Sequence, residues 1–160
     1  MHSYERAGMP REKAIAYAYH LREQARGIPV RHRAGDNERR KAYGNVAKAF
    51  LTSAGETGAT SRERSEYYRL AAEAFLSLHD HAQAAQAYEK ASKFTEAAQN
   101  YRHAGMFDKT VSVIKNYGAV MDTSVAERLT DVARYYYFER GDFEYVLLFY
   151  PPLATSHIRP

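Results

Sequence analysis

The chain has 160 residues, of which 45% are hydrophobic and 26% charged, and its formal net charge is +4. This length and this apolar content predict a single domain with a sizeable core. The sequence contains no cysteine, which excludes disulfide bonds, thiol catalysis and cysteine-ligated zinc. No apolar run is long enough to span a bilayer and no signal-peptide pattern opens the chain, so we expect no membrane partner and an intracellular protein, cytoplasmic or nuclear.

The N-terminal part predicts a helix followed by a basic connection. After a lead-in over residues 1–10, an apolar stripe of helical spacing runs to about Arg26 and predicts the first helix. Residues 27–37 form the connection, in which Gly35-Asp36-Asn37 supplies turn and cap chemistry for the next helix. Lys and Arg outnumber Asp and Glu in this front part of the chain, whereas the remainder is nearly neutral.

Two further helices precede the clearest pattern in the chain. The first spans about residues 38–54, and the second begins at a capping box formed by Thr60 and Glu63. The sequence VAKAFL at 46–51 resembles AAEAFL at 71–76. Both helices therefore extend the pattern that follows them.

Residues 71–118 repeat an apolar pattern every thirteen residues. The first copy has Ala84, Ala85, Tyr88, Ala91 and Phe94, the second has Ala97, Ala98, Tyr101, Ala104 and Phe107, and a weaker third has Thr110, Val111, Ile114 and Tyr117. Within one copy these positions lie on one face of a helix. A step of thirteen residues leaves about 220° of rotation after whole turns, so one continuous helix would scatter the faces. The chain must therefore reverse between copies, which predicts short antiparallel helices.

Cap residues support a reversal of the chain between the copies. Gly105 can adopt the left-handed conformation that ends many helices, and Asp80 and Ser92 are candidate N-caps. Each pair of copies then forms a helical hairpin with a short turn.

The C-terminal part predicts two more helices. Gly118 closes the helix of the third copy, and a second capping-box pattern, Ser124-x-x-Glu127, opens a long helix to about Arg140. A final short helix spans 143–150 and is apolar nearly all round, so further helical repeats are candidate partners at this end. Residues 151–160 form a tail without periodicity.

The spacing of small and aromatic residues is similar to the second helix of a tetratricopeptide repeat (TPR), although the usual period of about 34 residues differs from the spacing here. Four stretches resemble the helical region of the large fungal TPR-and-ankyrin-repeat-containing, UvrD-helicase-like proteins: AYHLREQAR (18–26), YYRLAAEAF (67–75), AAQNYRHAGMFDKTVSVIKNYG (97–118) and VARYYYFERGDF (132–143). In that family the helical region accompanies a helicase-like ATPase segment. This chain has no G-x-x-x-x-G-K-[ST] phosphate loop, so neither ATPase nor helicase activity is carried over.

We therefore predict an all-α protein, a TPR-like α-solenoid of about eight short antiparallel helices that fill residues 11–150 as one domain. The predicted function is a non-catalytic scaffold that binds a protein or peptide partner. Polar positions of the clearest copies are candidate contacts in its groove: Lys90, Lys93, Asn100 and Arg102.

The alternative is an accessory nucleic-acid-binding domain. The basic stretch over residues 22–41 could neutralise phosphates, and its candidate contacts are Arg31, Arg33, Arg39, Arg40 and Lys41. Glu23, Asp36 and Glu38 interrupt this stretch, which favours a solvated linker and a protein partner over a nucleic acid.

Two short motifs suggest chemistry but have simpler interpretations. His79-Asp80-His81 contains metal-binding residue types, yet no second cluster lies at ligand spacing, so we interpret it as a solvated turn. GETGAT at 55–60 precedes a helix, but no Lys follows it, so we interpret it as a plain loop rather than a phosphate site. No catalytic residue, metal ligand or cofactor is therefore predicted.

Overall fold

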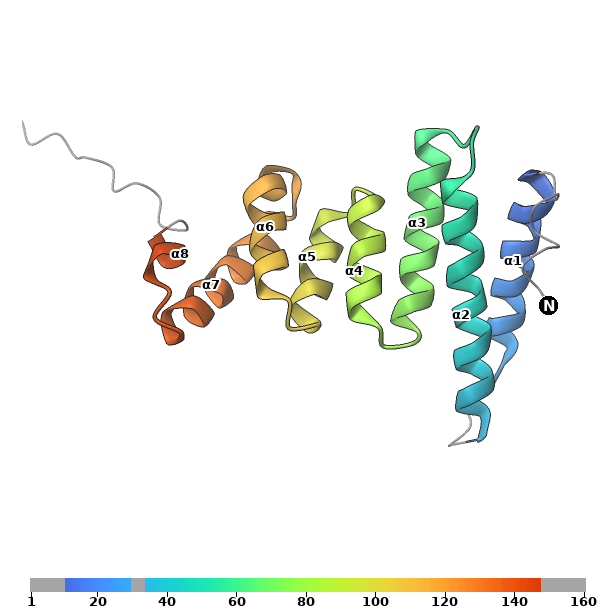
Figure 1. Ribbon diagram of the computed structural model, residues 1–160, viewed down its shortest axis with the longest axis horizontal. Coiled ribbons are helices and arrows are strands. Elements are labelled where there is room, and N and C mark those ends of the chain that lie inside the picture. Colours follow the sequence, from blue (N-terminus) through green and yellow to red (C-terminus); the bar gives the residue numbers. More distant parts are fainter. Residues whose placement is uncertain (1–10, 30–33, 148–160) are drawn as a thin grey trace, which may run out of the picture.

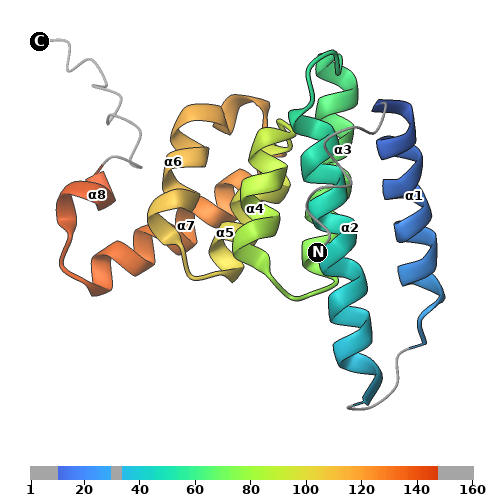
Figure 2. The same cartoon turned by 45° about the vertical axis from the view of Figure 1, so that its right-hand side comes forward.

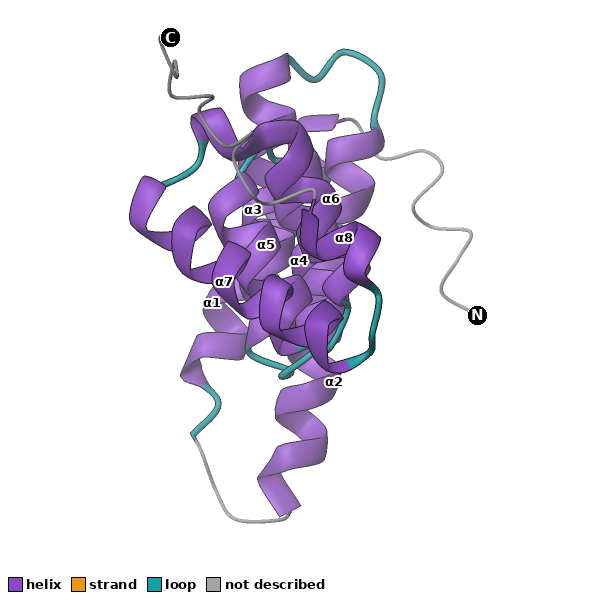
Figure 3. Ribbon diagram, turned by 90° about the vertical axis from the view of Figure 1, so that its left-hand side faces the viewer, coloured by secondary structure: helices purple, strands orange, loops and turns teal. Residues whose placement is uncertain are grey.

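The computed structural model describes residues 11–29 and 34–147, and within these ranges it contains helices and no strands (Figure 3). The helices are α1 (Arg11–Gly27), α2 (Ala34–Gly55), α3 (Ser61–Leu76), α4 (His81–Lys90), α5 (Phe94–His103), α6 (Phe107–Tyr117), a 3₁₀ helix (Gly118–Val120), α7 (Thr123–Glu139) and α8 (Phe143–Leu147). The prediction of an all-α protein is confirmed. The last three residues of the predicted final helix and the whole tail lie outside the described residues.

The helices follow one another in space as they do in the sequence. In Figure 1, α1 to α6 stand side by side in a row and successive helices run in opposite directions. Each of these helices packs against the next, α7 packs against both α5 and α6, and α8 packs against α7. The turned view in Figure 2 shows the same elongated row.

The hydrophobic core is divided into three clusters along this row. The first lies between α1, α2 and α3 and includes Phe50 and Leu70. The second extends from α3 to α7, and Phe75 packs against both the first and the second. The third is small and gathers around Tyr137 where α6, α7 and α8 meet. Phe75 therefore joins the first two clusters, whereas the third shares no described residue with the second.

The alanine pairs of the thirteen-residue pattern lie at the centre of the second cluster. Ala84, Ala85, Ala97 and Ala98 are all fully buried. Their small side chains allow neighbouring helices to approach closely, while Tyr101 fills the space beside them. The Tyr101 hydroxyl donates a hydrogen bond of 2.7 Å to Glu89. Burial raises the pKa of Tyr101 most, and this hydrogen bond raises it further.

Left-handed residues at thirteen-residue intervals reverse the chain. His79, Ser92 and Gly105 have φ angles of 57°, 56° and 71°, and they follow α3, α4 and α5 respectively. In each turn the next N–H donates to the carbonyl of the aromatic residue five positions back: Asp80 to Phe75 (3.0 Å), Lys93 to Tyr88 (2.9 Å) and Met106 to Tyr101 (2.8 Å). This is the Schellman pattern of helix ends, and Gly141 repeats it after α7.

Three of the predicted cap residues are confirmed. Gly105 adopts the left-handed conformation. The Asp80 carboxylate accepts a hydrogen bond of 3.0 Å from the Gln83 N–H and caps α4. Thr60 and Glu63 form the reciprocal capping box at the start of α3.

Two predicted N-caps are wrong. Ser92 occupies the left-handed position after α4, and Lys93 precedes α5 without a side-chain cap bond. Ser124 lies inside α7, whose cap is Asp122: its carboxylate accepts hydrogen bonds from the Val125 N–H (3.0 Å) and from the Ser124 hydroxyl (2.9 Å). Aspartate, as a charged acceptor before the helix, takes the position in preference to serine.

The connection between the first two helices is also shorter than predicted. Helix α2 begins at Ala34, so Gly35-Asp36-Asn37 belongs to the helix and does not precede it. Glycine and asparagine weaken a helix by less than about 1 kcal/mol each. The packing of α2 between α1 and α3 outweighs that cost.

Exchanging residues at two equivalent left-handed positions is expected to have opposite effects. Ser92→Gly should raise the free energy of unfolding by up to about 1 kcal/mol, because glycine adopts this conformation without strain. Gly105→Ala should lower it by about 1 kcal/mol. A Cβ atom at Gly105 meets nothing within 4 Å, so the cost is conformational. Urea denaturation measures both values, and effects of the same sign would contradict this account.

Asp122→Ala is expected to lower the melting temperature at neutral pH, whereas Ser124→Ala should change it little. Hydrogen bonds from the Val125 N–H and the Ser124 hydroxyl lower the pKa of Asp122 below its ordinary value of 3.8. The Asp122 carboxylate therefore stabilises the folded state fully above its ordinary pKa of 3.8. This stabilisation is lost as the pH falls through the lower pKa that the group has in the folded state. Thermal denaturation between pH about 6 and about 2 should show the difference between wild type and Asp122→Ala narrowing with acidification. A constant difference would contradict the assignment.

Candidate functional site

The basic stretch is partly neutralised within the molecule. Arg22 donates to Glu73 of α3 over 3.2 Å, and Arg26 pairs with Glu23 over 3.2 Å. The Arg39 guanidinium lies 5.3 Å from the centre of the Tyr43 ring. These contacts lower the positive charge that the stretch presents to a ligand.

The other predicted nucleic-acid contacts do not form a described cluster. Arg31 and Arg33 lie outside the described residues. Arg40 and Lys41 are exposed on α2, and Lys41 borders a hollow between α1 and α2 together with the acidic Glu38. Lys41 thus shares its surroundings with the acidic Glu38 and not with a cluster of basic side chains in the described residues.

The predicted groove contacts are separated from one another. Lys90 lies over the ring of Tyr68, with 5.5 Å between its ammonium and the ring centre, and Lys93 is exposed before α5. Asn100 is buried, with its amide bonded to His81 and to the Glu96 carbonyl, each over 2.8 Å. Of the four residues, Arg102 lines a groove between α5 and α7.

This groove lies between α5 and α7 and has a volume of about 610 Å³. Helix α5 contributes Gln99, Arg102 and His103, and α7 contributes Val125, Arg128, Leu129, Asp131 and Val132. We call it the α5–α7 groove. Seven of these eight residues were not predicted as contacts from the sequence.

The groove lies where the thirteen-residue spacing of left-handed turn residues ends. The position thirteen residues after Gly105 is Gly118, whose φ of −53° is not left-handed. The chain continues as the 3₁₀ helix, and α7 then crosses to contact both α5 and α6. The Asp122 N–H donates to the Thr95 hydroxyl over 3.0 Å and fixes the start of α7 beside the start of α5.

The floor of the groove is apolar. Val125, Leu129 and Val132 follow one another at helical spacing (i, i+4, i+7) on α7, so they form a stripe about 10 Å long. Leu129 is buried at 4% exposure and also belongs to the core, whereas the two valines are half-buried. The stripe therefore continues the core outward to a surface that solvent reaches.

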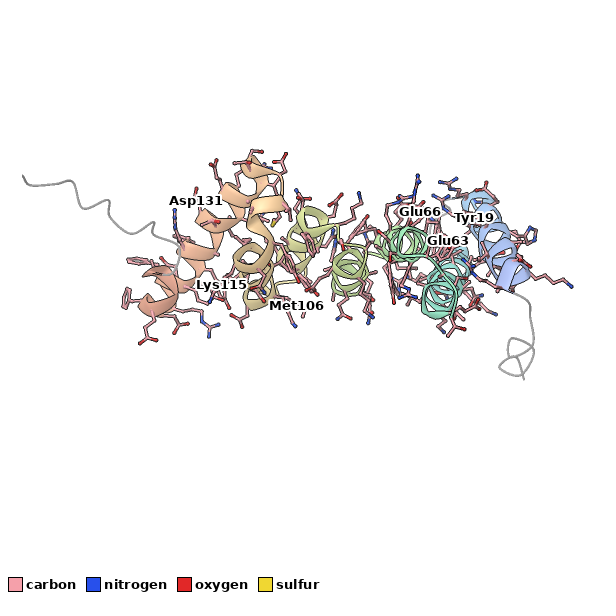
Figure 4. All side chains as sticks on the ribbon, turned by 90° about the horizontal axis from the view of Figure 1, so that it is seen from above. Tyr19, Glu63, Glu66, Met106, Lys115 and Asp131 are labelled. Carbon is pink, nitrogen blue, oxygen red and sulfur yellow. The ribbon has the colours of Figure 1, made fainter. Side chains whose placement is uncertain are left out.

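The rim of the groove is positively charged. Arg102, His103 and Arg128 are exposed, and neither arginine forms an ion pair within 4.0 Å among residues 11–29 and 34–147. Arg128 is near enough to Asp122 to contribute to the lowered pKa of that carboxyl. Arg128 donates only to the carbonyl of Ser124 on its own helix, over 3.4 Å. Asp131, labelled on α7 in Figure 4, is paired with Arg134 over 2.9 Å. Among the lining residues the one acidic group thus pairs with an arginine of its own helix and not with Arg102 or Arg128.

His103 also belongs to a series of ring contacts. His81 packs against His103 with the rings tilted by 30° (5.2 Å between ring centres), whereas Phe94 stacks on Tyr117 (3.8 Å) and Phe107 on Tyr136 (4.1 Å). His81, Phe94 and Phe107 are each the first residue of their helix and lie thirteen residues apart. The histidine pair therefore occupies the position that the two Phe–Tyr pairs occupy further along the chain, and the described residues contain no group of three or more metal-binding side chains.

No family model, curated protein or solved structure matches this chain. Among the helices that the structure describes, none has the length and apolar content to cross a membrane. The site is therefore interpreted from its own geometry and charge. The apolar stripe at Val125, Leu129 and Val132 was visible in the sequence, but its exposure depends on the crossing of α7.

Thr95→Val is expected to weaken the attachment of α7 and to lower the free energy of unfolding by about 1 kcal/mol, because it removes the acceptor for the Asp122 N–H. Thr95→Ser retains the hydroxyl and serves as the control. Urea denaturation measures the stability, and amide chemical shifts report on residues 122–125. Equal stability of the valine and serine variants would contradict the proposed role of the hydroxyl.

Proposed function

We propose that this chain is a non-catalytic helical-repeat scaffold of the TPR-like, α-solenoid type, which binds a protein segment in the α5–α7 groove. The observation that carries the proposal is the combination of an apolar floor on α7 with exposed cations on both sides of it. Helical arrays bind extended or helical peptides in such grooves, with apolar anchors and polar contacts at the rim.

The arrangement of the helices supports the repeat part of this proposal. Residues thirteen positions apart have equivalent roles in three features: the buried alanine pairs, the left-handed turns and the ring contacts made by the first residue of a helix. Successive helices pack in chain order, as expected when similar units follow one another.

The sequence resemblance supports a more specific setting. We propose, on this resemblance alone, that the chain acts as the helical arm of a protein related to the fungal TPR-and-ankyrin-repeat-containing, UvrD-helicase-like proteins. In this setting the arm contributes binding, and any nucleotide chemistry belongs to a separate ATPase segment.

The contacts of the basic stretch favour a protein partner over a nucleic acid. The ion pairs of Arg22 with Glu73 and of Arg26 with Glu23 use charges that phosphate binding would require. The groove also lacks Phe, Tyr and Trp among its lining residues, which are the usual stacking surfaces for bases.

Selection of a random peptide library against the chain tests the proposal. We expect enriched peptides that shift amide resonances of α5 and α7, and whose affinity falls at least tenfold in Val132→Arg, because the long side chain fills the groove. Gln86→Arg introduces the same side chain at an exposed site on α4 and should retain the affinity, so it is the matched control.

Binding of single-stranded RNA and duplex DNA, measured by fluorescence anisotropy at increasing salt, tests the alternative. Tight binding that falls steeply with salt and disappears on charge reversal of Arg31, Arg33, Arg39 and Arg40, together with no enriched peptide, would replace the scaffold proposal with the nucleic-acid one.

A further inference from the structure

The α5–α7 groove has features that select the chemistry of its ligand. We infer that it binds a short acidic segment of a partner protein, in which two apolar side chains contact the α7 stripe and carboxylates pair with Arg102 and Arg128. This inference rests on the proposed function, which leaves the chemistry of the partner open.

The floor determines the apolar part of the ligand. The stripe of Val125, Leu129 and Val132 is about 10 Å long, which is the length of two helical turns. Two apolar side chains at i and i+4 of a helical peptide, or at i and i+2 of an extended one, lie about 6–7 Å apart and fit within this length. Burying them there extends the core cluster to which Leu129 already belongs.

The rim determines the charge of the ligand. A peptide that covers the floor removes water from Arg102 of α5 and Arg128 of α7. Desolvating a cation is unfavourable unless an anion pairs with it, and two arginines can each bind a carboxylate with parallel hydrogen bonds. Asp131 pairs with Arg134 of its own helix, and neither Arg102 nor Arg128 forms an ion pair within the described residues. The complementary ligand is therefore acidic.

The chain's own tail does not have this chemistry. Residues 148–160 contain no Asp or Glu and include Arg159. The side-chain charge of this segment therefore has the same sign as the rim and does not complement it. Residues 148–160 therefore do not supply the side-chain carboxylates that the rim would pair with.

A nucleic acid also carries negative charge but fits the floor poorly. Phosphates would pair with the two arginines, yet the sugar and base edges would cover an apolar stripe that has no Phe, Tyr or Trp to stack on, and the His103 ring at the rim already packs against His81. Apolar amino-acid side chains beside carboxylates satisfy both the floor and the rim.

Three peptides of one design test the inference on the full chain. Each has two leucines at i and i+4 in a helix-forming sequence, and the flanking residues are glutamate, glutamine or lysine. Titrations are followed by ¹⁵N NMR and by fluorescence anisotropy at low and moderate salt. We expect the glutamate peptide to shift the amides of residues 99–103 and 125–132 and to bind about tenfold more tightly than the glutamine peptide.

Charge-reversed variants identify the residues responsible. Arg102→Glu together with Arg128→Glu should abolish the preference for glutamate and favour the lysine peptide. Lys48→Glu with Arg62→Glu makes the same change of net charge at exposed sites on α2 and α3 and should retain the preference. Circular dichroism of both double variants confirms that the helices are intact.

Several outcomes would overturn the inference. These are equal affinity for the glutamate and glutamine peptides, an equal loss in both double variants, or no groove shift with the glutamate peptide. If the library selection still yields peptides that bind in the groove, the scaffold function stands and only the acidic specificity fails. If the selection also yields none, the proposed function fails as well.

Discussion

A left-handed residue after every ten or so helical residues is the constraint on which the arrangement of α3 to α6 depends. His79, Ser92 and Gly105 each turn the chain back, and each turn is closed by a hydrogen bond to the carbonyl of a core aromatic residue. The aromatic residue thus fixes both the end of its helix and the packing against the next one. Because both functions recur at thirteen-residue intervals, the helices form a row with equivalent contacts between neighbours.

The groove is a consequence of the first departure from this constraint. At Gly118 the backbone remains in the right-handed region, so α7 does not continue the row as an equivalent helix. Its start is attached to Thr95, two helices back, and its apolar stripe is left partly uncovered beside the end of α5. Arg102 and His103, which also interact favourably with the C-terminal end of the α5 dipole, then become the rim of a groove.

The regular part of the fold could be predicted from the sequence because its signals are local. Helical spacing of alanine and tyrosine, together with Gly105, Asp80 and the Thr60–Glu63 box, placed most helix boundaries correctly. Ser92 was misassigned as a cap although its alignment with Gly105 at thirteen residues already indicated the left-handed position. Serine is found in both environments, and only the pattern distinguishes them.

The groove itself could not be predicted because it depends on contacts between distant residues. Asn100 and Arg102 are two positions apart and both polar, yet about 200° of helical rotation places the first in the core and the second at the groove. That neither Arg102 nor Arg128 forms an ion pair within the described residues is likewise a property of the packed helices. Sequence patterns indicate which face of a helix is apolar, but not which part of that face the next helix covers.

The order of contacts along the row has a consequence for the synthesis of the chain. From α1 to α6, every helix packs against the one made immediately before it, so each hairpin can fold as it leaves the ribosome without waiting for distant residues. Helix α7 differs, because it must find α5 as well as α6. A nascent chain that ends before α7 would therefore lack the part of the second core cluster that α7 supplies, Val125, Ala126 and Leu129.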